Sequence, residues 1–590
     1  MSPSASPTPS PSLSASPSPN GLSAYWLSDL QKLPAENLLR KSPSPITLSS
    51  ARQETVAFQV ILENTGPTSV TAAVSLSPLK IAGSTSSPVS VQLFRAHYLQ
   101  IKGLSRLSYE TYDERHIPLA LQRPYTISAG KAIGAGTWTD RPDHDKSYPD
   151  PLPPISNGSS VTVAPNRSQS VWVDLYVPKG TAPGSYTGTL TVGSISMSVT
   201  LGVHALVLPD RPTFRFWAHM DDNNLALRFG VNDRAHRDQV HQLAHEHGFD
   251  LSDTKLGQDA PPPTEWQDRL TGALYTPARG YNGRGQGVGN QTLSIGPYGS
   301  WNWTQDQATM LSKATAWRQW LTANAPATKA SLYLIDESSN YALIEQLAGW
   351  VKPSGLTTFA TLPIPAVSNV PSLTAWASWI TVGRTSWTDL VTAAKNRGVS
   401  FGLYNGKRPA FGSFAIEDEG TAMHANLVGN VKLGSESLFY WSCCYFNDYQ
   451  GGRGQTDVWK TAATFSGALS TSSVLGETGW NHSNGDGVLF YPGTDNLYPA
   501  SSLGLNQMVS SIRAKLIRRA LQDLDYLALA KEKKPTETMA LIRSLVPEVG
   551  WELDVYSTSD PTYVHKGPSW PIDALTWELA RETAKGYALQ

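Results

Sequence analysis

Residues 22–207 carry short apolar runs separated by Gly, Pro, Ser and Asn. Runs of this length, rich in β-branched residues and bounded by turn residues, are typical of antiparallel strands. We therefore predict an antiparallel β-sandwich over this stretch. The predicted strands are 55–62, 69–76, 89–94, 170–177, 188–192 and 194–203. Residues 103–158 show little periodicity, so we expect an extended loop there.

From about residue 208 the pattern changes to strand, loop and helix in turn. Such alternation predicts a parallel sheet with crossover helices, and the length of the region fits a (β/α)8 TIM-like barrel with insertions. Candidate strands are 213–218, 332–335, 358–362, 379–382, 400–404 and 437–441, with two more between 249 and 300. Candidate helices are 234–247, 305–324, 341–350, 387–396 and 459–469.

The chain of 590 residues is too long for one hydrophobic core, so a multidomain protein is expected. We predict four parts. They are a disordered Ser/Pro linker at 1–21, a β-sandwich at 22–207, a (β/α)8 catalytic barrel at 208–505 and a small, mainly helical C-terminal region at 506–590. Helices are expected in the last part at 507–529, 535–545 and 577–586.

The Ser/Pro-rich linker can neither bury apolar area nor form a helix. Such spacers often tether an exported domain to a lipid or to the cell wall, so we expect an extracellular, cell-surface or periplasmic protein. No hydrophobic signal precedes the linker, and we expect an export signal to have been removed ahead of Met1. No apolar stretch reaches the roughly 18 residues of a membrane span.

Composition excludes some classes of function. The net charge of −1 and the lack of a basic run argue against nucleic-acid binding. Trp (19) and Tyr (23) are plentiful, which suits sugar-binding clefts, although large cores use aromatic residues as well. Cys443 and Cys444 are adjacent, so they can neither staple the fold nor form a zinc site, and we expect reduced, partly buried thiols.

Histidines crowd the predicted helix 234–247. His241 and His245 lie four residues apart on one helix face, a spacing that metal sites use. No catalytic Glu follows the first of them, so we interpret them as structural. We expect neither a metal nor another cofactor.

Two carboxylates, Asp336 and Glu337, directly follow the apolar run 331–335. Acids are costly beside a buried strand unless they have a role, and the carboxyl end of barrel strands is where such folds place their chemistry. Paired carboxylates are also what glycosidic bond cleavage requires. Both can face the barrel mouth only if the chain kinks after Ile335. The alternative is a helix-capping acid beside a surface acid.

Further candidate substrate contacts follow other predicted strands. Polar or aromatic side chains at strand ends suggest a lining for a sugar ring, with core packing as the alternative. The candidates are His219, Asp221, Tyr404, Asn405, Arg408, Trp441 and Tyr445. The acidic run 417–419 is expected to be a surface loop.

At these residues the chain resembles glycoside hydrolase family 123, a group of β-N-acetylgalactosaminidases. The resemblance rests on 54–59, 172–178, 184–188, 334–337, 484–493 and 511–526. It implies retaining, substrate-assisted hydrolysis of β-linked N-acetylhexosaminides, with Glu337 as general acid/base and Asp336 orienting the 2-acetamido group. Residues 412–419 and the Cys443–Cys444 pair depart from the family pattern and place the chain in a divergent branch.

The expected partner is therefore an oligo- or polysaccharide. Two alternatives stay open at this point. One is a glycosidase acting on another bacterial polysaccharide, and the other is a non-catalytic glycan-binding protein held at the cell surface by its spacer.

Overall fold

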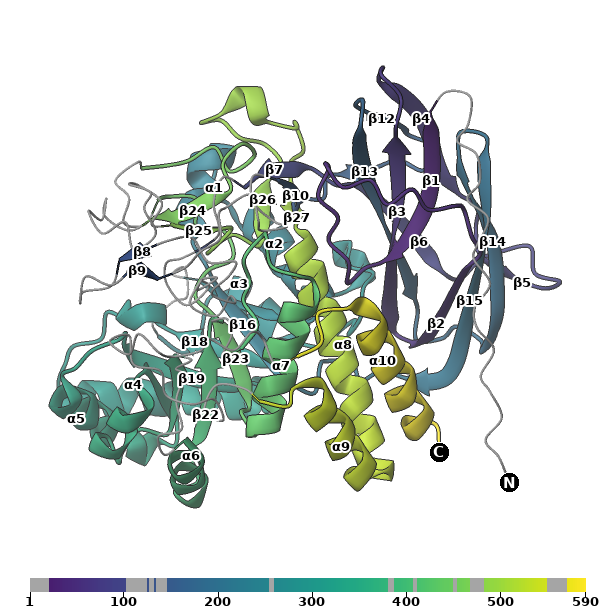
Figure 1. The fold of residues 1–590 in the computed structure, drawn as a ribbon. Coiled ribbons are helices and arrows are strands. Elements are labelled where there is room, and N and C mark those ends of the chain that lie inside the picture. Colours follow the sequence, from purple (N-terminus) through teal and green to yellow (C-terminus); the bar gives the residue numbers. More distant parts are fainter. Residues whose placement is uncertain are drawn as a thin grey trace.

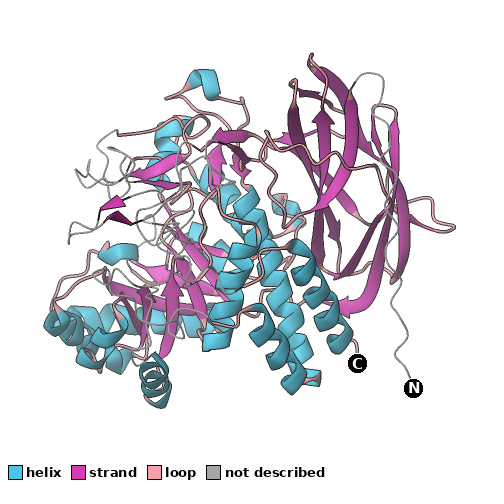
Figure 2. Ribbon diagram, viewed as in Figure 1, coloured by secondary structure: helices cyan, strands magenta, loops and turns pink. Residues whose placement is uncertain are grey.

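The computed structural model describes residues 21–101, 105, 125–126, 132–133, 146–253, 259–379, 387–406, 411–448, 454–466, 482–548 and 570–590. Strands from the N-terminal part form a sandwich, and the next strands form a barrel with helices around it (Figures 1 and 2). No helix in the described ranges has the length and apolar character needed to cross a bilayer.

The sandwich has two sheets, with strand orders β1-β3-β13-β6-β11 and β12-β4-β14-β15-β2, and β5 pairs with β14. Apolar side chains from both sheets meet in one core. The six predicted strands fall on β3, β4, β6, β13, β14 and β15. The strands are β1 (Leu22–Ser28), β2 (Ile46–Arg52), β3 (Glu54–Asn64), β4 (Val70–Leu76), β5 (Lys80–Ile81), β6 (Ser90–Arg95), β11 (Pro154–Ile155), β12 (Ser160–Val163), β13 (Arg167–Val177), β14 (Gly184–Val192) and β15 (Ile195–Val207).

Short two-stranded antiparallel pairs accompany these two units. Strand β7 (Tyr98–Gln100) pairs with β10 (Ser147–Pro149), and β8 (Tyr125–Thr126) pairs with β9 (Ala132–Ile133). Strand β24 (Ala463–Ser466) pairs with β25 (His482–Asn484), and β26 (Phe490–Pro492) pairs with β27 (Met508–Ser510). The predicted helix 459–469 is wrong where the structure describes it, because that segment contains β24.

The barrel is one sheet of eight parallel strands in the order β17-β16-β23-β22-β21-β20-β19-β18. This order follows the chain around a ring. Each predicted barrel strand falls on an observed strand or within a few residues of one. The strands are β16 (Arg215–Met220), β17 (Asp250–Asp253), β18 (Thr292–Ile295), β19 (Lys329–Ile335), β20 (Thr357–Thr361), β21 (Ala375–Trp379), β22 (Ser400–Tyr404) and β23 (Ser437–Tyr440).

One seam of the barrel is closed by side chains. Strands β17 and β18, both fully described, share no backbone ladder. Instead, the Asp250 carboxylate accepts hydrogen bonds from the backbone N–H groups of Gln291 and Thr292, each at 2.9 Å. The hydroxyl oxygen of Ser252 accepts one from Ser294 N at 3.2 Å. Side-chain oxygens thus satisfy backbone donors that a ladder would otherwise use.

Helices surround the strands. The α-helices are α1 (Asp222–Phe229), α2 (Arg234–Glu246), α3 (Thr264–Thr271), α4 (Gln307–Asn324), α5 (Tyr341–Val351), α6 (Trp387–Asn396), α7 (Thr421–Leu433), α8 (Ile512–Lys533), α9 (Pro535–Leu545) and α10 (Ala574–Ala588). Short 3-10 helices are η4 (Pro277–Arg279), η5 (Pro297–Gly299), η6 (Lys352–Ser354), η7 (Ile364–Asn369) and η8 (Pro499–Ser501).

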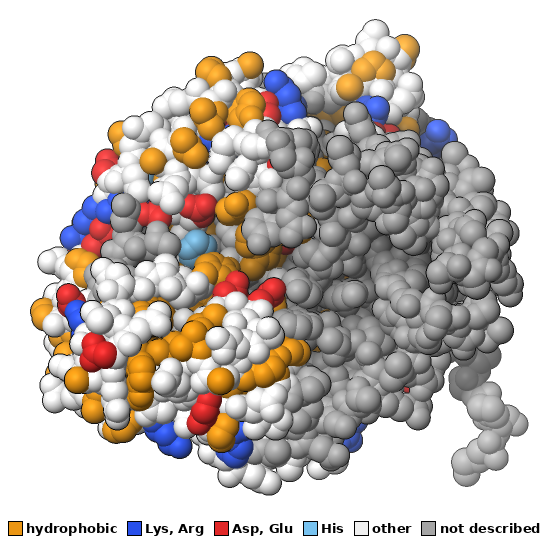
Figure 3. Space-filling model, turned by 90° about the vertical axis from the view of Figure 1, so that its left-hand side faces the viewer, with side chains coloured by type: hydrophobic (Ala, Val, Ile, Leu, Met, Phe, Trp, Pro, Cys, Tyr) orange, Lys and Arg blue, Asp and Glu red, His pale blue; other side chains and the backbone are white. Residues whose placement is uncertain are grey.

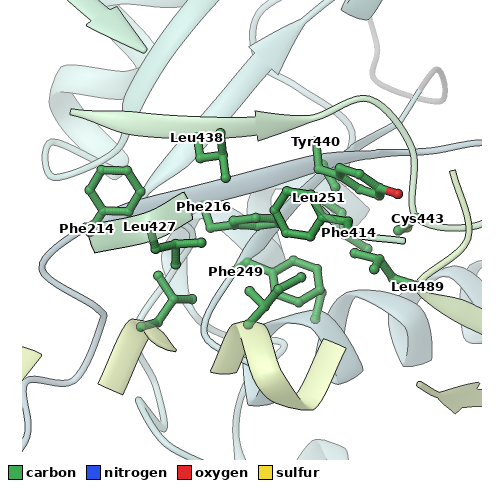
Figure 4. Close-up of a cluster of buried hydrophobic side chains, with 14 of the residues drawn as sticks. Phe214, Phe216, Phe249, Leu251, Phe414, Leu427, Leu438, Tyr440, Cys443 and Leu489 are labelled. Carbon is green, nitrogen blue, oxygen red and sulfur yellow. The ribbon is translucent and has the colours of Figure 1, made fainter. Parts of the chain in front are cut away.

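The outer face of the barrel strands forms a continuous apolar core with the helices. In Figure 4 the side chains of Phe216 and Leu438 point from the strands toward Phe249 and toward Leu427 of α7. The rings of Phe216 and Phe249 meet edge to face, with centroids 5.3 Å apart. Burial of such rings contributes strongly to holding strands and helices together.

Helix α8 lies between the barrel and the sandwich (Figure 1). Its side chains are buried along most of its length. Four of its cationic side chains form buried ion pairs with aspartates on the sandwich or just beyond its strands. The pairs are Arg513–Asp150 (2.8 Å), Lys515–Asp174 (2.5 Å), Arg518–Asp174 (2.6 Å) and Arg519–Asp29 (2.9 Å). Breaking one partner of such a pair is costly, so α8 fixes how the two units meet.

The predicted fold class is wrong as stated. The sandwich is not wholly antiparallel, because β2 and β15 pair in parallel. The barrel is not a complete (β/α)8 unit, because β17 and β18 lack a ladder and because the described residues 362–374, between β20 and β21, contain η7, a 3-10 helix, in place of an α-helix. The C-terminal helices are not a separate small region, because α8 shares the core of the barrel. What the structure supports is a multidomain chain with a nearly closed, all-parallel, TIM-like barrel. The exact limits of the predicted domains stay predictions.

Candidate active site

The chain bends sharply where the two candidate catalytic acids lie. The pairing of β19 with β20 shifts register between Tyr333 and Ile335, and Glu337 adopts a left-handed conformation with φ of 43°. Bulges re-aim side chains, and a non-glycine residue at positive φ is held there by its surroundings. The kink predicted after Ile335 is therefore present at the carboxyl end of β19.

Three hydroxyl groups hold the two acids. The hydroxyls of Tyr333 and Thr361 each donate a hydrogen bond to Asp336 Oδ1 at 2.7 Å. The backbone N–H of Glu337 donates to Thr361 Oγ1 at 2.8 Å. The hydroxyl of Tyr404 donates to Glu337 Oε1. Because Tyr404 ends β22, three strands along the sheet from β19, the Glu337 side chain reaches across the barrel mouth.

Below the acids, the barrel interior is filled by a separate aromatic cluster. Its members are Trp217, Tyr333, Phe359, Ala375, Ala377, Tyr404 and Phe439, with Tyr298 packed against them. Trp217 and Phe439 stack with centroids 4.0 Å apart. Burial, helped by the nearby Asp336 carboxylate, raises the pKa of Tyr333 well above its usual value. Its hydroxyl therefore remains protonated and can donate to Asp336.

His219 lies in this interior layer, on β16. Its ring meets that of Tyr298 edge to face at 5.1 Å, and only 9% of the residue is exposed. Its Nε2 atom is buried and has no hydrogen-bond partner among the described residues. Burial lowers the pKa of His219 to about 4, so the imidazole is neutral near neutral pH. His219 thus lies beneath the barrel mouth. Its predicted contact with substrate stays a prediction.

Two other candidates form hydrogen bonds within the fold, and their contact with substrate stays a prediction. Asp221 caps α1, where its carboxylate accepts hydrogen bonds from Asn223 N at 3.1 Å and Asn224 Nδ2 at 2.9 Å. Asn405 has a φ of 59°, and its Oδ1 accepts a hydrogen bond from Trp441 N at 3.1 Å, which ties the end of β22 to the end of β23. Arg408 lies outside the described residues.

Trp441 and Tyr445 form a half-buried aromatic surface after β23. Their ring centroids are 5.2 Å apart, and Phe465 meets Trp441 edge to face at 5.7 Å. The indole N–H of Trp441 donates to Asp486 Oδ1 at 2.6 Å, which fixes the orientation of the ring. The hydroxyl of Tyr298 donates to the carbonyl oxygen of Trp441.

Sequence reasoning missed Tyr298, Tyr333, Thr361 and Asp486. Tyr333 and Thr361 are the least obvious, because a Tyr or Thr within an apolar strand is indistinguishable from a core residue by pattern. One signal was available for Thr361, which is the last residue of β20 and therefore lies at the same barrel end as the acids.

Two of the three residues in the acidic run 417–419 are buried. Glu417 and Asp418 are 5% and 1% exposed, so the expectation of a surface loop is wrong. The Glu417 carboxylate accepts a hydrogen bond from Ser105 N, and burial raises its pKa. The Lys32 ammonium donates to the Asp418 carbonyl oxygen at 2.7 Å and to two neighbouring carbonyls. Segments distant in sequence thus provide the partners that permit burial.

The remaining expectations concern cysteines and histidines. Cys443 and Cys444 are free and fully buried. His241 contacts Asp253 at 3.3 Å, and His245 contacts Tyr281 at 2.8 Å; both contacts agree with the structural interpretation of these histidines. Within the described ranges, no group of His, Cys, Asp or Glu is arranged to hold a metal ion.

Figure 3 shows the side of the molecule that lies at the left in Figure 1. Acidic side chains and a histidine lie close together there among hydrophobic ones. Carboxylates beside apolar surface are the combination that sugar rings require, because their hydroxyls need acceptors and their C–H faces need apolar contact.

Comparisons with known proteins concern the fold and the N-terminal part of the chain. Residues 122–194 match the family described as Glycoside hydrolase 123 N-terminal domain. A family 123 glycoside hydrolase from Clostridium perfringens has a similar structure, with a TM-score of 0.59 and 10% identity over 96% of this chain and 98% of that chain. No curated protein sequence matches significantly.

Two further solved structures have much lower scores. A GH2 β-galacturonidase from Eisenbergiella tayi has a TM-score of 0.23 and 8% identity over 72% of this chain and 65% of that chain. A putative α-galactosidase/melibiase from Bacteroides fragilis has a TM-score of 0.21 and 10% identity over 45% of this chain and 63% of that chain. At these TM-scores neither structure supports a conclusion about the fold or function of this chain.

The fold is therefore a sandwich joined to a TIM-like barrel, an architecture shared with a glycoside hydrolase over nearly its whole length. More specifically, residues 122–194 match the N-terminal domain of glycoside hydrolase family 123, and an enzyme of that family has a similar fold. This confirms the resemblance inferred from the sequence.

Proposed function

We propose that the protein is a glycoside hydrolase that cleaves β-linked N-acetylhexosaminides of the N-acetylgalactosamine type with retention of configuration. The observation that carries this proposal is the pair Asp336–Glu337, exposed at the barrel mouth and held by hydroxyls from three different strands. Surface acids with no role do not require such support.

Asp336 is suited to orient the substrate's acetamido group. Both supporting hydroxyls bind the same oxygen, Oδ1, which leaves Oδ2 to accept a hydrogen bond from the acetamido N–H. Such a bond raises the electron density of the acetamido carbonyl oxygen. That oxygen then attacks the anomeric carbon in place of an enzyme nucleophile, a known exception to the two-carboxylate scheme.

Glu337 is suited to act as general acid and then as general base. Its carboxyl group would protonate the leaving glycosidic oxygen and later remove a proton from the attacking water. The Tyr404 hydroxyl binds one of its two oxygens and sets the direction of the other. The positive φ of Glu337 gives the carboxyl group a position different from that of Asp336, so the two acids can take different roles.

Kinetics of three variants test the proposal. Glu337→Gln and Asp336→Asn should each lower kcat/KM on nitrophenyl N-acetyl-β-galactosaminide by about 10²–10⁴-fold. Glu532→Gln, on the exposed end of α8, is the matched control and should have wild-type activity. A trifluoroacetamido substrate should react more slowly, because its carbonyl oxygen is a weaker nucleophile. Full activity of Glu337→Gln would contradict the assignment.

The same experiment separates the alternatives. Activity on a glycan without acetamido groups, lost in Glu337→Gln, would indicate a glycosidase of different specificity. Binding of glycans without turnover would indicate a surface glycan-binding protein.

We also propose an extracellular or cell-surface location with a lipid or wall tether, since polymeric glycans occur outside the cell. Cell fractionation tests this location.

A further inference from the structure

A cavity of about 730 Å³ lies on the outer side of the barrel, between α2 and the sandwich. Strands β6 and β13 line it on one side, and α2, β27 and the first part of α8 line it on the other. Its volume lies within the range of about 300–1,000 Å³ that is typical of small-molecule sites, which often occur where domains meet. It shares none of its lining residues with the candidate active site.

Three ionisable side chains on its wall have unused hydrogen-bonding capacity. The Lys515 ammonium bonds Asp174 at 2.5 Å and has two further N–H donors. No described residue forms a hydrogen bond or ion pair with the carboxylate of Glu246 or with the hydroxyl of Tyr176. The Lys515 ammonium, the Glu246 carboxylate and the Tyr176 hydroxyl therefore line the same partly open cavity without bonding one another.

Burial changes the protonation of these groups. It raises the pKa of Glu246 above its usual range and that of Tyr176 to about 12, and it lowers the pKa of Lys515 to about 8. Such groups gain free energy when a ligand supplies the hydrogen bonds that water otherwise provides. The Lys515 ammonium is also held over the Phe94 ring at 3.6 Å, so its position is fixed before a ligand arrives.

The balance of charge indicates the kind of ligand. The two acids at the cavity floor, Asp174 and Glu246, are matched by two bases, Lys515 and Arg518, the latter bound to Asp174 at 2.6 Å. A charged ligand would leave an uncompensated charge in this partly desolvated space. The rim carries amide side chains, including Gln92 and Gln239, which can both donate and accept hydrogen bonds.

We propose that this cavity is a second carbohydrate-binding site, which takes a neutral, hydroxyl-rich sugar unit between the sandwich and α2. Each ring hydroxyl can donate to Glu246 and accept from Lys515, which bridges two groups that the protein leaves apart. The site is independent of the catalytic proposal, since it requires no contribution from Asp336 or Glu337. For a polymeric substrate it would hold a chain segment away from the barrel mouth.

Hydrogen exchange of the full-length chain tests the site without reference to activity. The probes are galactose, N-acetylgalactosamine, cellobiose and N,N′-diacetylchitobiose. At least one should slow exchange in the segments 90–94 and 239–247. Protection in neither segment with any of the four sugars would mean that the cavity holds only water, and would overturn the proposal.

Two variants test whether the protection from hydrogen exchange arises from sugar bound in this cavity. Gln92→Trp fills the rim from an exposed position, and Glu246→Gln removes the acceptor charge while keeping its shape. Each should weaken the protection by about tenfold or more in apparent affinity. Thr189→Trp, exposed on the other sheet, is the matched control and should leave binding unchanged. Unaltered protection in Gln92→Trp would overturn the proposal, whereas loss of activity in Glu337→Gln with protection retained would leave it standing.

Discussion

One hydroxyl group, that of Thr361, supports both candidate catalytic acids. It donates to Asp336 Oδ1 at 2.7 Å and accepts from Glu337 N at 2.8 Å, and the residue is only 1% exposed. Thr361→Val keeps the shape of the side chain and removes both bonds. Because a hydrogen bond to a charged group contributes about 1.5–3 kcal/mol, we expect the free energy of unfolding to fall by about 2 kcal/mol.

The effect on catalysis should be larger than the effect on stability. Without the hydroxyl, the turn at Asp336 and Glu337 loses the two hydrogen bonds that fix these acids relative to β20. A misplacement of roughly 1 Å costs about 10²-fold in rate, so we expect kcat to fall by that factor. The KM should change little, because Thr361 is buried under the acids, and we expect no contact between Thr361 and the substrate.

The assay is steady-state hydrolysis of nitrophenyl N-acetyl-β-galactosaminide, with thermal unfolding measured in parallel. Thr361→Ser is the matched control, since it keeps the hydroxyl and should restore most of the lost kcat. If folded Thr361→Val retained kcat within about threefold of the wild type, the positioning argument would be wrong.

Three further predictions concern buried contacts elsewhere in the protein. Arg513→Leu leaves Asp150 buried and unpaired, so the free energy of unfolding in urea should fall by about 3–5 kcal/mol, with no rescue by Arg513→Lys. Burial lowers the pKa of Lys585 to about 7, so the unfolded chain binds more protons above that pH, and stability should rise with pH between 7 and 9. The rise due to this group is at most about 1.4 kcal/mol per pH unit, and Lys585→Met should remove it. Gly412→Ala would place its Cβ 1.6 Å from the carbonyl oxygen of Ala422, so the thermal unfolding temperature should drop markedly; an unchanged value would contradict the packing described.

The local pattern of apolar and polar residues was sufficient to predict most strands of the sandwich and barrel, but it did not predict some of the helices. Helix α7 (Thr421–Leu433) was missed because it is buried on nearly all sides and therefore lacks the periodic polar face that marks a surface helix. Strand β3 was found although every one of its residues is buried. Its run of β-branched and aromatic residues marks a strand even without alternation.

The site could be predicted only in part. The acids were identifiable because two carboxylates after an apolar run are locally unusual. The hydrogen bonds of Asp221 and Asn405 were not, because a polar residue after a strand has the same appearance whether it caps a helix, bonds a neighbouring backbone or contacts a substrate. The bonds with Asn223 N and Trp441 N depend on the tertiary structure, and a substrate contact by either residue stays a prediction.

The sequence by itself determined the barrel strands and six strands of the sandwich, the order of the two units and the place where two acids leave the barrel. These features depend on residues close together along the chain, whose apolar pattern and turn chemistry act locally. The tertiary structure decided the parallel β2–β15 pair, the side-chain closure between β17 and β18, and the position of α8 between the two units. It also decided which hydroxyls hold Asp336 and Glu337. Each of these depends on partners tens or hundreds of residues apart, which meet only when burial of the common core brings them together.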